Sequence, residues 1–92
     1  MTAGPYRVEL LGPTRRSVAE KLPEPVAAAV LEFCAGPLTE NPARVGKPLF
    51  GPLAGCHGAR RGTYRVVYRI DDENHRVLVL DVAPRRVVYG HQ

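Results

Sequence analysis

The chain has 92 residues, 45% of them hydrophobic and 24% charged, and a formal net charge of +4. This length suits one modest core, so we expect a single domain over residues 1–92. The composition excludes a disordered or fibrous protein, and no apolar run approaches the ~20 residues that span a bilayer. The N-terminus also lacks the basic and apolar segments of a secretory signal, so we expect a cytoplasmic protein.

The positive charge lies in the C-terminal half. Residues 1–40 carry four basic and five acidic side chains, whereas residues 41–92 carry nine basic and four acidic ones. The two halves therefore have net charges of −1 and +5. A basic surface attracts polyanions, so a nucleic-acid partner is the first to test, and an acidic protein the second. A merely solvated basic surface remains a fair alternative at this charge.

The first 35 residues predict a strand and two helices. Residues 6–12 alternate as a strand with Tyr6, Val8 and Leu10 on one face, and Gly12-Pro13 ends it. A short helix follows from residue 13 to residue 22, where Pro23 forces a break. Residues 24–36 then show the apolar stripe of an amphipathic helix, and Gly36-Pro37 stops or bends it. Two helices joined at one proline are expected to form a hairpin that packs on a sheet.

The remaining residues predict a loop and an antiparallel meander. Residues 38–55 are rich in Gly and Pro, and we interpret them as a surface loop that carries Arg44 and Lys47. From residue 56 onward the pattern is that of strands, with an apolar and an arginine-bearing face over residues 64–70. Residues 71–75 form a turn, and residues 76–83 return as a central strand. The fold class is α+β: an N-terminal strand, a helical hairpin, then a meander, with the helices on one face of a twisted sheet.

Arginine is strongly preferred over lysine in the basic half. It occurs at positions 60, 61, 65 and 69 and again at 85 and 86, whereas the chain has lysine only at 21 and 47. The guanidinium fork matches phosphate oxygens two at a time and keeps its charge, which favours a phosphate ligand. For each single arginine, a solvated charge or a salt bridge to an acid of residues 71–81 is at least as plausible.

Tyr89 and three other side chains are further candidates. Tyr89 follows the last strand beside cations and suits a base-stacking platform, although a role as cover for the core edge is about equally plausible. His57 precedes the arginine-rich strand and is a weak general acid–base candidate. Cys34 and Cys56 have no metal-binding spacing, so we expect idle thiols and no metal site.

Nearly the whole chain resembles the RelE toxin family of type II toxin–antitoxin systems. The resemblance rests on "NPARVGKPL", on "LAG", on "RRGTYRVVYRIDDENHRVLVLDVAPRRVVY" and on the terminal R-x-x-x-Y, in the family's order and spacing. It runs from about Tyr6 to Tyr89 and implies a small toxin that enters the ribosomal A site and cleaves mRNA there. It also implies a cognate, RelB-like antitoxin that wraps the toxin and blocks it.

The resemblance implies site roles for individual residues. Arg65 matches the strand arginine that contacts the scissile phosphate, and Arg85 matches an arginine that stabilises the transition state or acts as an acid. Tyr89 matches a C-terminal tyrosine that stacks on a base or assists proton transfer. We expect five further residues to bind RNA: Arg60, Arg61, Lys47, Arg44 and Arg86.

Two positions depart from the family pattern. Gly58 stands where the family has a second basic residue, and Pro84 stands where it often has a histidine. The expected chemistry is attack of a 2′-hydroxyl on the adjacent phosphate, assisted by fixed guanidinium groups, without a metal or another cofactor. Two alternatives stay open: a ParE-like inhibitor of DNA gyrase that shares the fold, and a catalytically weak member that binds antitoxin or ribosome.

Overall fold

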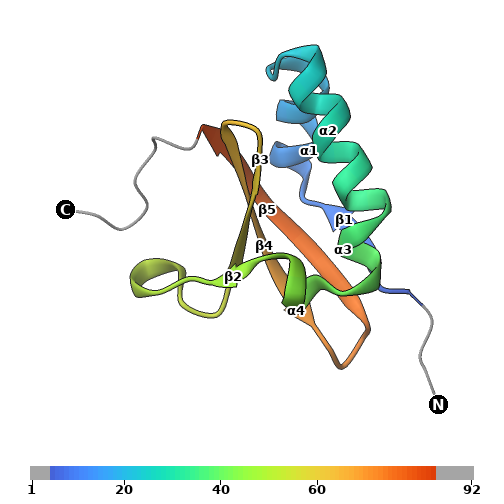
Figure 1. Ribbon diagram of the computed structural model, residues 1–92, viewed down its shortest axis with the longest axis vertical. Coiled ribbons are helices and arrows are strands. Elements are labelled where there is room, and N and C mark those ends of the chain that lie inside the picture. Colours follow the sequence, from blue (N-terminus) through green and yellow to red (C-terminus); the bar gives the residue numbers. More distant parts are fainter. Residues whose placement is uncertain (1–4, 85–92) are drawn as a thin grey trace.

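The computed structural model of the protein describes residues 5–84, which form one five-stranded sheet and its helices (Figure 1). Two long helices, α1 and α2, lie along one face of the sheet. The elements, in chain order, are β1 (Arg7–Leu10), α1 (Gly12–Glu20), α2 (Glu24–Ala35), α3 (Pro37–Glu40), α4 (Pro42–Val45), β2 (Lys47–Pro48), the 3-10 turn η1 (Gly51–Leu53), β3 (His57–Arg61), β4 (Tyr64–Asp71) and β5 (Arg76–Pro84).

The strands are ordered β1-β5-β4-β3-β2. The predicted antiparallel meander is confirmed for β3, β4 and β5. β1 joins the sheet in parallel beside β5, with Arg7 opposite Arg76 and Leu10 opposite Val79. β5 therefore has a neighbour on each side, as its nearly continuous apolar sequence predicts.

Proline sets the boundaries of both long helices. Pro13 and Pro25 each occupy the first turn of a helix, where the missing backbone N–H costs nothing. α1 ends before Pro23, and α2 ends before Gly36, so the predicted helical hairpin is confirmed. No helix within residues 5–84 is long and apolar enough to cross a membrane.

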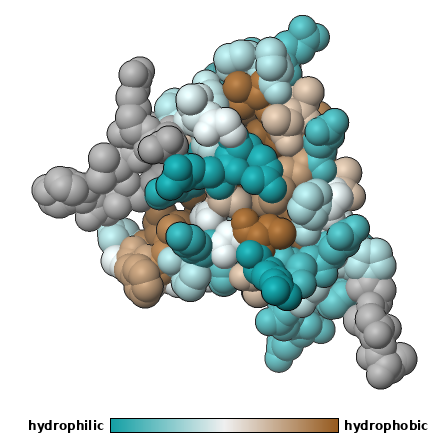
Figure 2. Space-filling model, in the orientation of Figure 1, coloured by the Kyte–Doolittle hydropathy of each residue, from teal (hydrophilic) through white to brown (hydrophobic). Residues whose placement is uncertain are grey.

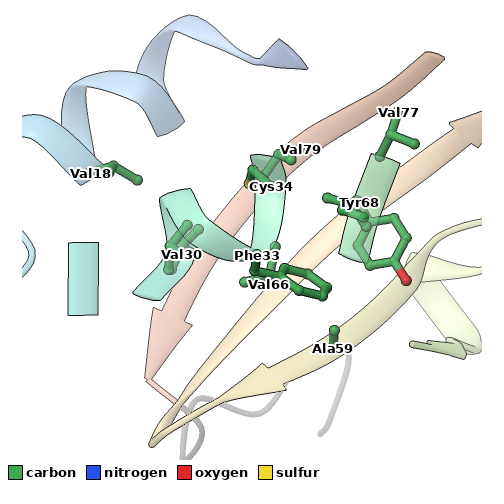
Figure 3. Packing of buried hydrophobic residues seen from close by; sticks show 11 residues of the cluster. Val18, Val30, Phe33, Cys34, Ala59, Val66, Tyr68, Val77 and Val79 are labelled. Carbon is green, nitrogen blue, oxygen red and sulfur yellow. The ribbon is translucent and has the colours of Figure 1, made fainter. Parts of the chain in front are cut away.

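The core lies between the helical hairpin and the inner face of the sheet (Figure 3). α1 contributes Val18 and α2 contributes Val30 and Phe33, while the largest strand residue in the cluster is Tyr68 on β4. Tyr68 is fully buried, and its hydroxyl donates a hydrogen bond of 2.6 Å to the carbonyl of Pro42. This bond ties α4 to the middle of the sheet.

The segment 38–55 is more regular than the predicted loop. It contains the end of α3, the one-turn helix α4, the short edge strand β2 and η1. Pro37 and Pro42 each start a one-turn helix, and β2 pairs with β3 in an antiparallel register. The prediction of a plain loop was wrong because the prolines and glycines punctuate short elements here instead of preventing them.

A bulge in β5 reverses which of the following side chains face the core. Val67 pairs with Asp81 and the next residue, Tyr68, pairs with Val79, so Leu80 is an extra residue on β5. Strict alternation would put Asp81 on the same face as Val79, in the core. The bulge instead buries Val82 and leaves Asp81 exposed on the outer face.

Candidate nucleic-acid interface

A hollow of about 580 Å³ lies where α4, β2, β3 and β4 meet. Four cationic residues line it: Arg44, Lys47, Arg60 and Arg65. They come from four different elements, and each was predicted from the sequence to contact RNA. Figure 2 shows hydrophilic residues across the middle of the visible face, over β3, with hydrophobic residues among them.

Arg60 and Arg65 share a face of the sheet because they are direct partners in the pairing of β3 and β4. In an antiparallel pair, opposite side chains project to the same side with their Cβ atoms about 5 Å apart. Arg65 is half-buried and Arg60 is exposed. Two like charges at this spacing repel each other, and an anion bound between them relieves that repulsion.

Lys47 belongs to the neighbouring row on the same face. It lies opposite Gly58 on β3, and Gly58 in turn lies opposite Val67 on β4. Gly58 has no side chain, and a Cβ added there would lie 3.2 Å from a methyl carbon of Leu49 and 3.4 Å from Cδ of Arg65. Leu49 and the stem of Arg65 therefore close over Gly58 and form an apolar floor beside the cations.

Gly46, between α4 and β2, lets this segment lie close to β3 and β4. A Cβ at this position would overlap the hydroxyl of Tyr68 and would lie 2.8 Å from the carbonyl oxygen of Gly58. Because no other residue fits here without a shift, glycine fixes the approach of the segment that carries Arg44 and Lys47.

The described residues that line the hollow include no carboxylate. Asp81 lies on the same face of the sheet, opposite Val67 and outside the set of lining residues. Asp71 lies at the far end of β4, where it accepts hydrogen bonds from Asn74 and pairs with Arg76 at 3.5 Å. The hydrogen bonds from Asn74, more than the charge of Arg76, hold the pKa of Asp71 below its usual value. The hollow is therefore lined by one sign of charge.

Arg61 lies on the opposite face of the sheet from Arg60. Its guanidinium carbon is 3.8 Å from the centre of the Phe33 ring, on the side where the helices pack. A guanidinium over an aromatic face makes a cation–π contact. The structure thus separates Arg61 from the other predicted RNA-binding residues of β3 and β4 and gives it a contact with the core.

His57 also lies on the core side of the sheet. It is paired with Tyr68, and the two rings are stacked with centroids 5.7 Å apart. It is not among the residues that line the hollow. This geometry gives no support to His57 as a general acid or base at the cationic site.

Three predicted site residues, Arg85, Arg86 and Tyr89, lie outside the described residues 5–84. Their roles remain predictions. The last described residue of β5 is Pro84, which is exposed and pairs with Tyr64 at the end of the sheet.

Sequence reasoning missed the two apolar contributors to the site, Gly46 and Leu49. Alternation beyond Lys47 places Leu49 on the same face as Lys47 once residues 47–49 are extended. That signal is too short to recognise in a segment with several glycines and prolines. The close approach of Gly46 depends on Tyr68, which is 22 residues away, and no local pattern reports it.

The arrangement suits an extended polyanion. Fixed guanidinium groups on rigid strands hold phosphate oxygens at low entropic cost, and the apolar floor strengthens their attraction by excluding water. Single-stranded nucleic acid presents one phosphate per nucleotide along such a groove.

Comparison with known proteins identifies relatives for most of the chain. Residues 15–89 match the sequence model of the family described as ParE toxin of type II toxin-antitoxin system, parDE. Toxin RelE of Mycobacterium tuberculosis (strain ATCC 25618 / H37Rv) is 51% identical over 85 residues, which cover 92% of this chain and 87% of the relative. Toxin RelG of the same organism is also 51% identical over 85 residues, which cover 92% of this chain and 97% of the relative.

Solved structures show the same fold. The toxin–antitoxin complex RelBE2 of Mycobacterium tuberculosis contains a chain 52% identical to this one, with a TM-score of 0.81 over 88% of this chain and 99% of that chain. A chain of the archaeal RelE–RelB complex from Pyrococcus horikoshii OT3 is 24% identical, with a TM-score of 0.71 over 91% of this chain and 99% of that chain. The isolated E. coli RelE toxin is 20% identical, with a TM-score of 0.71 over 91% of this chain and 88% of that chain. The last two show the fold alone.

Proposed function

The chain belongs to the ParE-toxin family of type II toxin–antitoxin systems and is a relative of RelE toxins, and on that premise we propose that it cleaves mRNA in the ribosomal A site. It is the toxin of its system, and the cleavage inhibits translation. Its activity resides in a single domain over residues 1–92 and is exerted in the cytoplasm.

One observation supports this function most directly. Four cations from four elements line one hollow, and the described residues that line it include no carboxylate. An RNA backbone is the ligand that such a surface fits, because its phosphates match the guanidinium groups of Arg60 and Arg65.

The proposed reaction needs no metal. The 2′-hydroxyl attacks the adjacent phosphorus, the bond to the 5′-oxygen breaks, and negative charge grows on the non-bridging oxygens. Arg65 and Arg85 stabilise that charge, and Tyr89 stacks on a base or transfers a proton. Arg44, Lys47, Arg60 and Arg86 hold the RNA, whereas Arg61, on the opposite face of the sheet, contacts Phe33 instead. The ribosome supplies in-line orientation, which is worth roughly 7–11 kcal/mol in favourable cases.

A cognate, RelB-like antitoxin is the proposed partner that keeps the toxin inactive. Two of the related structures are of toxin–antitoxin complexes, RelBE2 and RelE–RelB. An acidic antitoxin segment laid across the cationic hollow would exclude RNA by occupying the same groups. The ribosome and mRNA are the other proposed partners.

Primer extension on mRNA from cells that express the chain tests the proposed activity. Cleavage at fixed positions within codons of translated messages, lost in the Arg65→Ala variant, supports it. Uncut messages in growth-arrested cells would contradict it.

A second candidate function is inhibition of DNA gyrase. It is favoured by the family match, whose description names a ParE toxin. In that case the same cells accumulate broken DNA, their mRNA stays intact, and Arg65→Ala keeps its toxicity. The arginine-lined hollow has no evident use in this function, so we rank it second.

A third candidate is a catalytically weak toxin, suggested by Gly58 and Pro84. Leu49 and the stem of Arg65 lie at the place where a side chain of residue 58 would project. Cleavage on ribosomes at the rates usual for the RelE family would remove this candidate.

A further inference from the structure

Lys47 differs chemically from the other cations of the hollow. Of the four, three are arginines, and Lys47 carries the single ammonium group. A guanidinium group does not give up its proton in proteins, whereas a lysine ammonium does so and serves enzymes as an acid or base. The described lining residues include no Asp, Glu, His or Tyr. Among them, Lys47 is therefore the residue that can transfer a proton.

The register places Lys47 within reach of a phosphate that Arg65 holds. Lys47 on β2, Gly58 on β3 and Val67 on β4 form one row across three strands, and Arg65 is two residues from Val67 on the same face. Neighbouring strands lie about 4.8 Å apart and residues rise about 3.4 Å along a strand, so the two residues start from positions about 12 Å apart. Two long side chains that converge from this separation can contact opposite sides of one phosphate.

Gly58 places no side chain of its own between these two residues, and Leu49 and the stem of Arg65 pack over it. Any larger residue there would project its side chain between Lys47 and Arg65, on the face of the hollow. The apolar floor that Leu49 and the Arg65 stem form in its place offers no competing charge to either cation.

RNA cleavage by a 2′-hydroxyl needs a proton at the departing oxygen. The 5′-oxygen leaves as a strongly basic alkoxide unless an acid protonates it as the bond to phosphorus breaks. A lysine ammonium carries its proton at neutral pH and is thus a donor in its resting state.

We propose that Lys47 is the general acid of the reaction, an assignment that rests on the proposed RNA cleavage. The 2′-oxygen bonds to phosphorus, and its proton passes to solvent. The bond between phosphorus and the 5′-oxygen breaks, and Lys47 gives a proton to that oxygen. The products are a 2′,3′-cyclic phosphate and a 5′-hydroxyl, and the neutral amine of Lys47 regains a proton from water.

A sulfur-substituted RNA tests this role. Single-turnover cleavage is measured on ribosomes programmed with mRNA that has either oxygen or sulfur as the bridging 5′-atom at the scissile bond. A thiolate leaves without protonation, so loss of the acid matters only for the oxygen RNA. We expect Lys47→Ala to cleave the oxygen RNA about 10²- to 10⁴-fold more slowly than wild type and the sulfur RNA at close to the wild-type rate.

Two matched variants separate acid catalysis from charge. Lys47→Arg keeps the positive charge without a transferable proton, so it is expected to bind the RNA normally and to cleave the oxygen RNA as slowly as Lys47→Ala. Lys21, the other lysine of the chain, is exposed just beyond the end of α1, and Lys21→Ala is expected to behave as wild type.

Three outcomes would overturn the assignment. Equal slowing of both RNAs by Lys47→Ala would mean that Lys47 only binds or positions the substrate. A full rate for Lys47→Arg on the oxygen RNA would mean that charge alone is needed. Failure of the wild-type chain to cleave either RNA would contradict the proposed function itself, and this assignment with it.

Discussion

Arg60 and Arg65 lie directly opposite each other on β3 and β4, with both side chains on the outer face of the sheet. A cross-strand pair of like charges lowers stability, and proteins usually place an acid or a neutral residue at one of the two positions. An anion bound between the two side chains would relieve this repulsion. On the proposed function, the pair is expected to affect stability and RNA affinity in opposite directions.

Replacement of Arg60 by threonine is expected to stabilise the free protein. Removing one of two opposed charges, and adding a good strand former, should raise the free energy of unfolding by about 0.2–1 kcal/mol. The same change should weaken RNA binding. If Arg60 contacts one phosphate, the slope of the logarithm of the binding constant against the logarithm of the salt concentration should become less steep by about 0.7. Urea denaturation and RNA titrations at several salt concentrations measure both effects. A less stable variant with unchanged RNA affinity would refute this reading of the pair.

Arg65→Ala is expected to lower the rate of RNA cleavage by about 10²- to 10³-fold, as loss of one transition-state donor does. Arg69→Ala is the matched control, because Arg69 lies four residues further along the same strand, on the same face, and is not among the residues that line the hollow. Both variants remove one charge from β4, so a general loss of electrostatic attraction should affect them alike. Equal rates for the two variants would contradict a specific role for Arg65.

Arg61→Gln is expected to lower stability more than it lowers activity. The change removes the cation–π contact with Phe33, which is worth about 0.5–2 kcal/mol, and leaves the hollow intact. Thermal unfolding and RNA affinity are to be compared with those of Arg60→Gln, which removes the same charge from the other face of β3. A larger loss of RNA affinity in Arg61→Gln than in Arg60→Gln would place the RNA on the helix side of the sheet.

Gly46→Ala is expected to destabilise the fold by about 1–3 kcal/mol, because the added methyl group overlaps the hydroxyl of Tyr68. Gly12→Ala is the control, since nothing lies within 4 Å of a Cβ at position 12, and it should be neutral or slightly stabilising. Chemical denaturation of both variants decides the point. A Gly46→Ala protein as stable as wild type would show that α4 and β2 can shift away from Tyr68 at little cost in free energy.

The stability of the fold is expected to fall between about pH 10 and pH 12. Burial raises the pKa of Tyr68 to about 12, and the charge of Arg61 opposes part of that rise. An unfolded tyrosine titrates near pH 10, so in this window the unfolded chain releases a proton that the folded chain retains. The contribution is fully present below pH 10 and is lost as the pH rises through the folded pKa.

Tyr68→Phe isolates this effect from the other tyrosines of the chain. The variant lacks the hydroxyl that donates to Pro42, so its free energy of unfolding below pH 9 should be lower than that of wild type. Between pH 9 and pH 11.5, however, that free energy should decrease less than it does in wild type. Denaturant midpoints across this range provide the comparison. Parallel pH profiles for the two proteins would show that Tyr68 does not titrate as its burial requires.

The sequence predicted the elements whose signal is local. Prolines at 13, 23 and 25 mark the ends of the helices, and the alternation over residues 64–70 marks β4. The segment 38–55 was predicted less well, because one-turn helices and a two-residue strand are too short to produce a periodic pattern.

Long-range geometry decided what the sequence did not reveal. Strict alternation assigns Asp81 to the core face, and only the bulge at Leu80 reverses that assignment. Arg60 and Arg61 are adjacent in sequence and look equivalent, yet they project to opposite faces, and only the pairing with β4 shows which one faces the hollow. The gathering of Arg44 and Lys47 with Arg65 likewise depends on how closely α4 approaches the sheet.

End-group analysis of the cleaved mRNA tests the central claim most directly. Ribosomes with a defined codon in the A site are incubated with the wild-type chain, with Arg65→Ala or with Arg69→Ala, and the ends of the fragments are identified. We predict one cut within the A-site codon, with a 2′,3′-cyclic phosphate and a 5′-hydroxyl, made by wild type and Arg69→Ala and nearly absent with Arg65→Ala. Intact mRNA with the wild-type chain, or fragments with 5′-phosphate ends, would contradict cleavage by the 2′-hydroxyl at this cationic site.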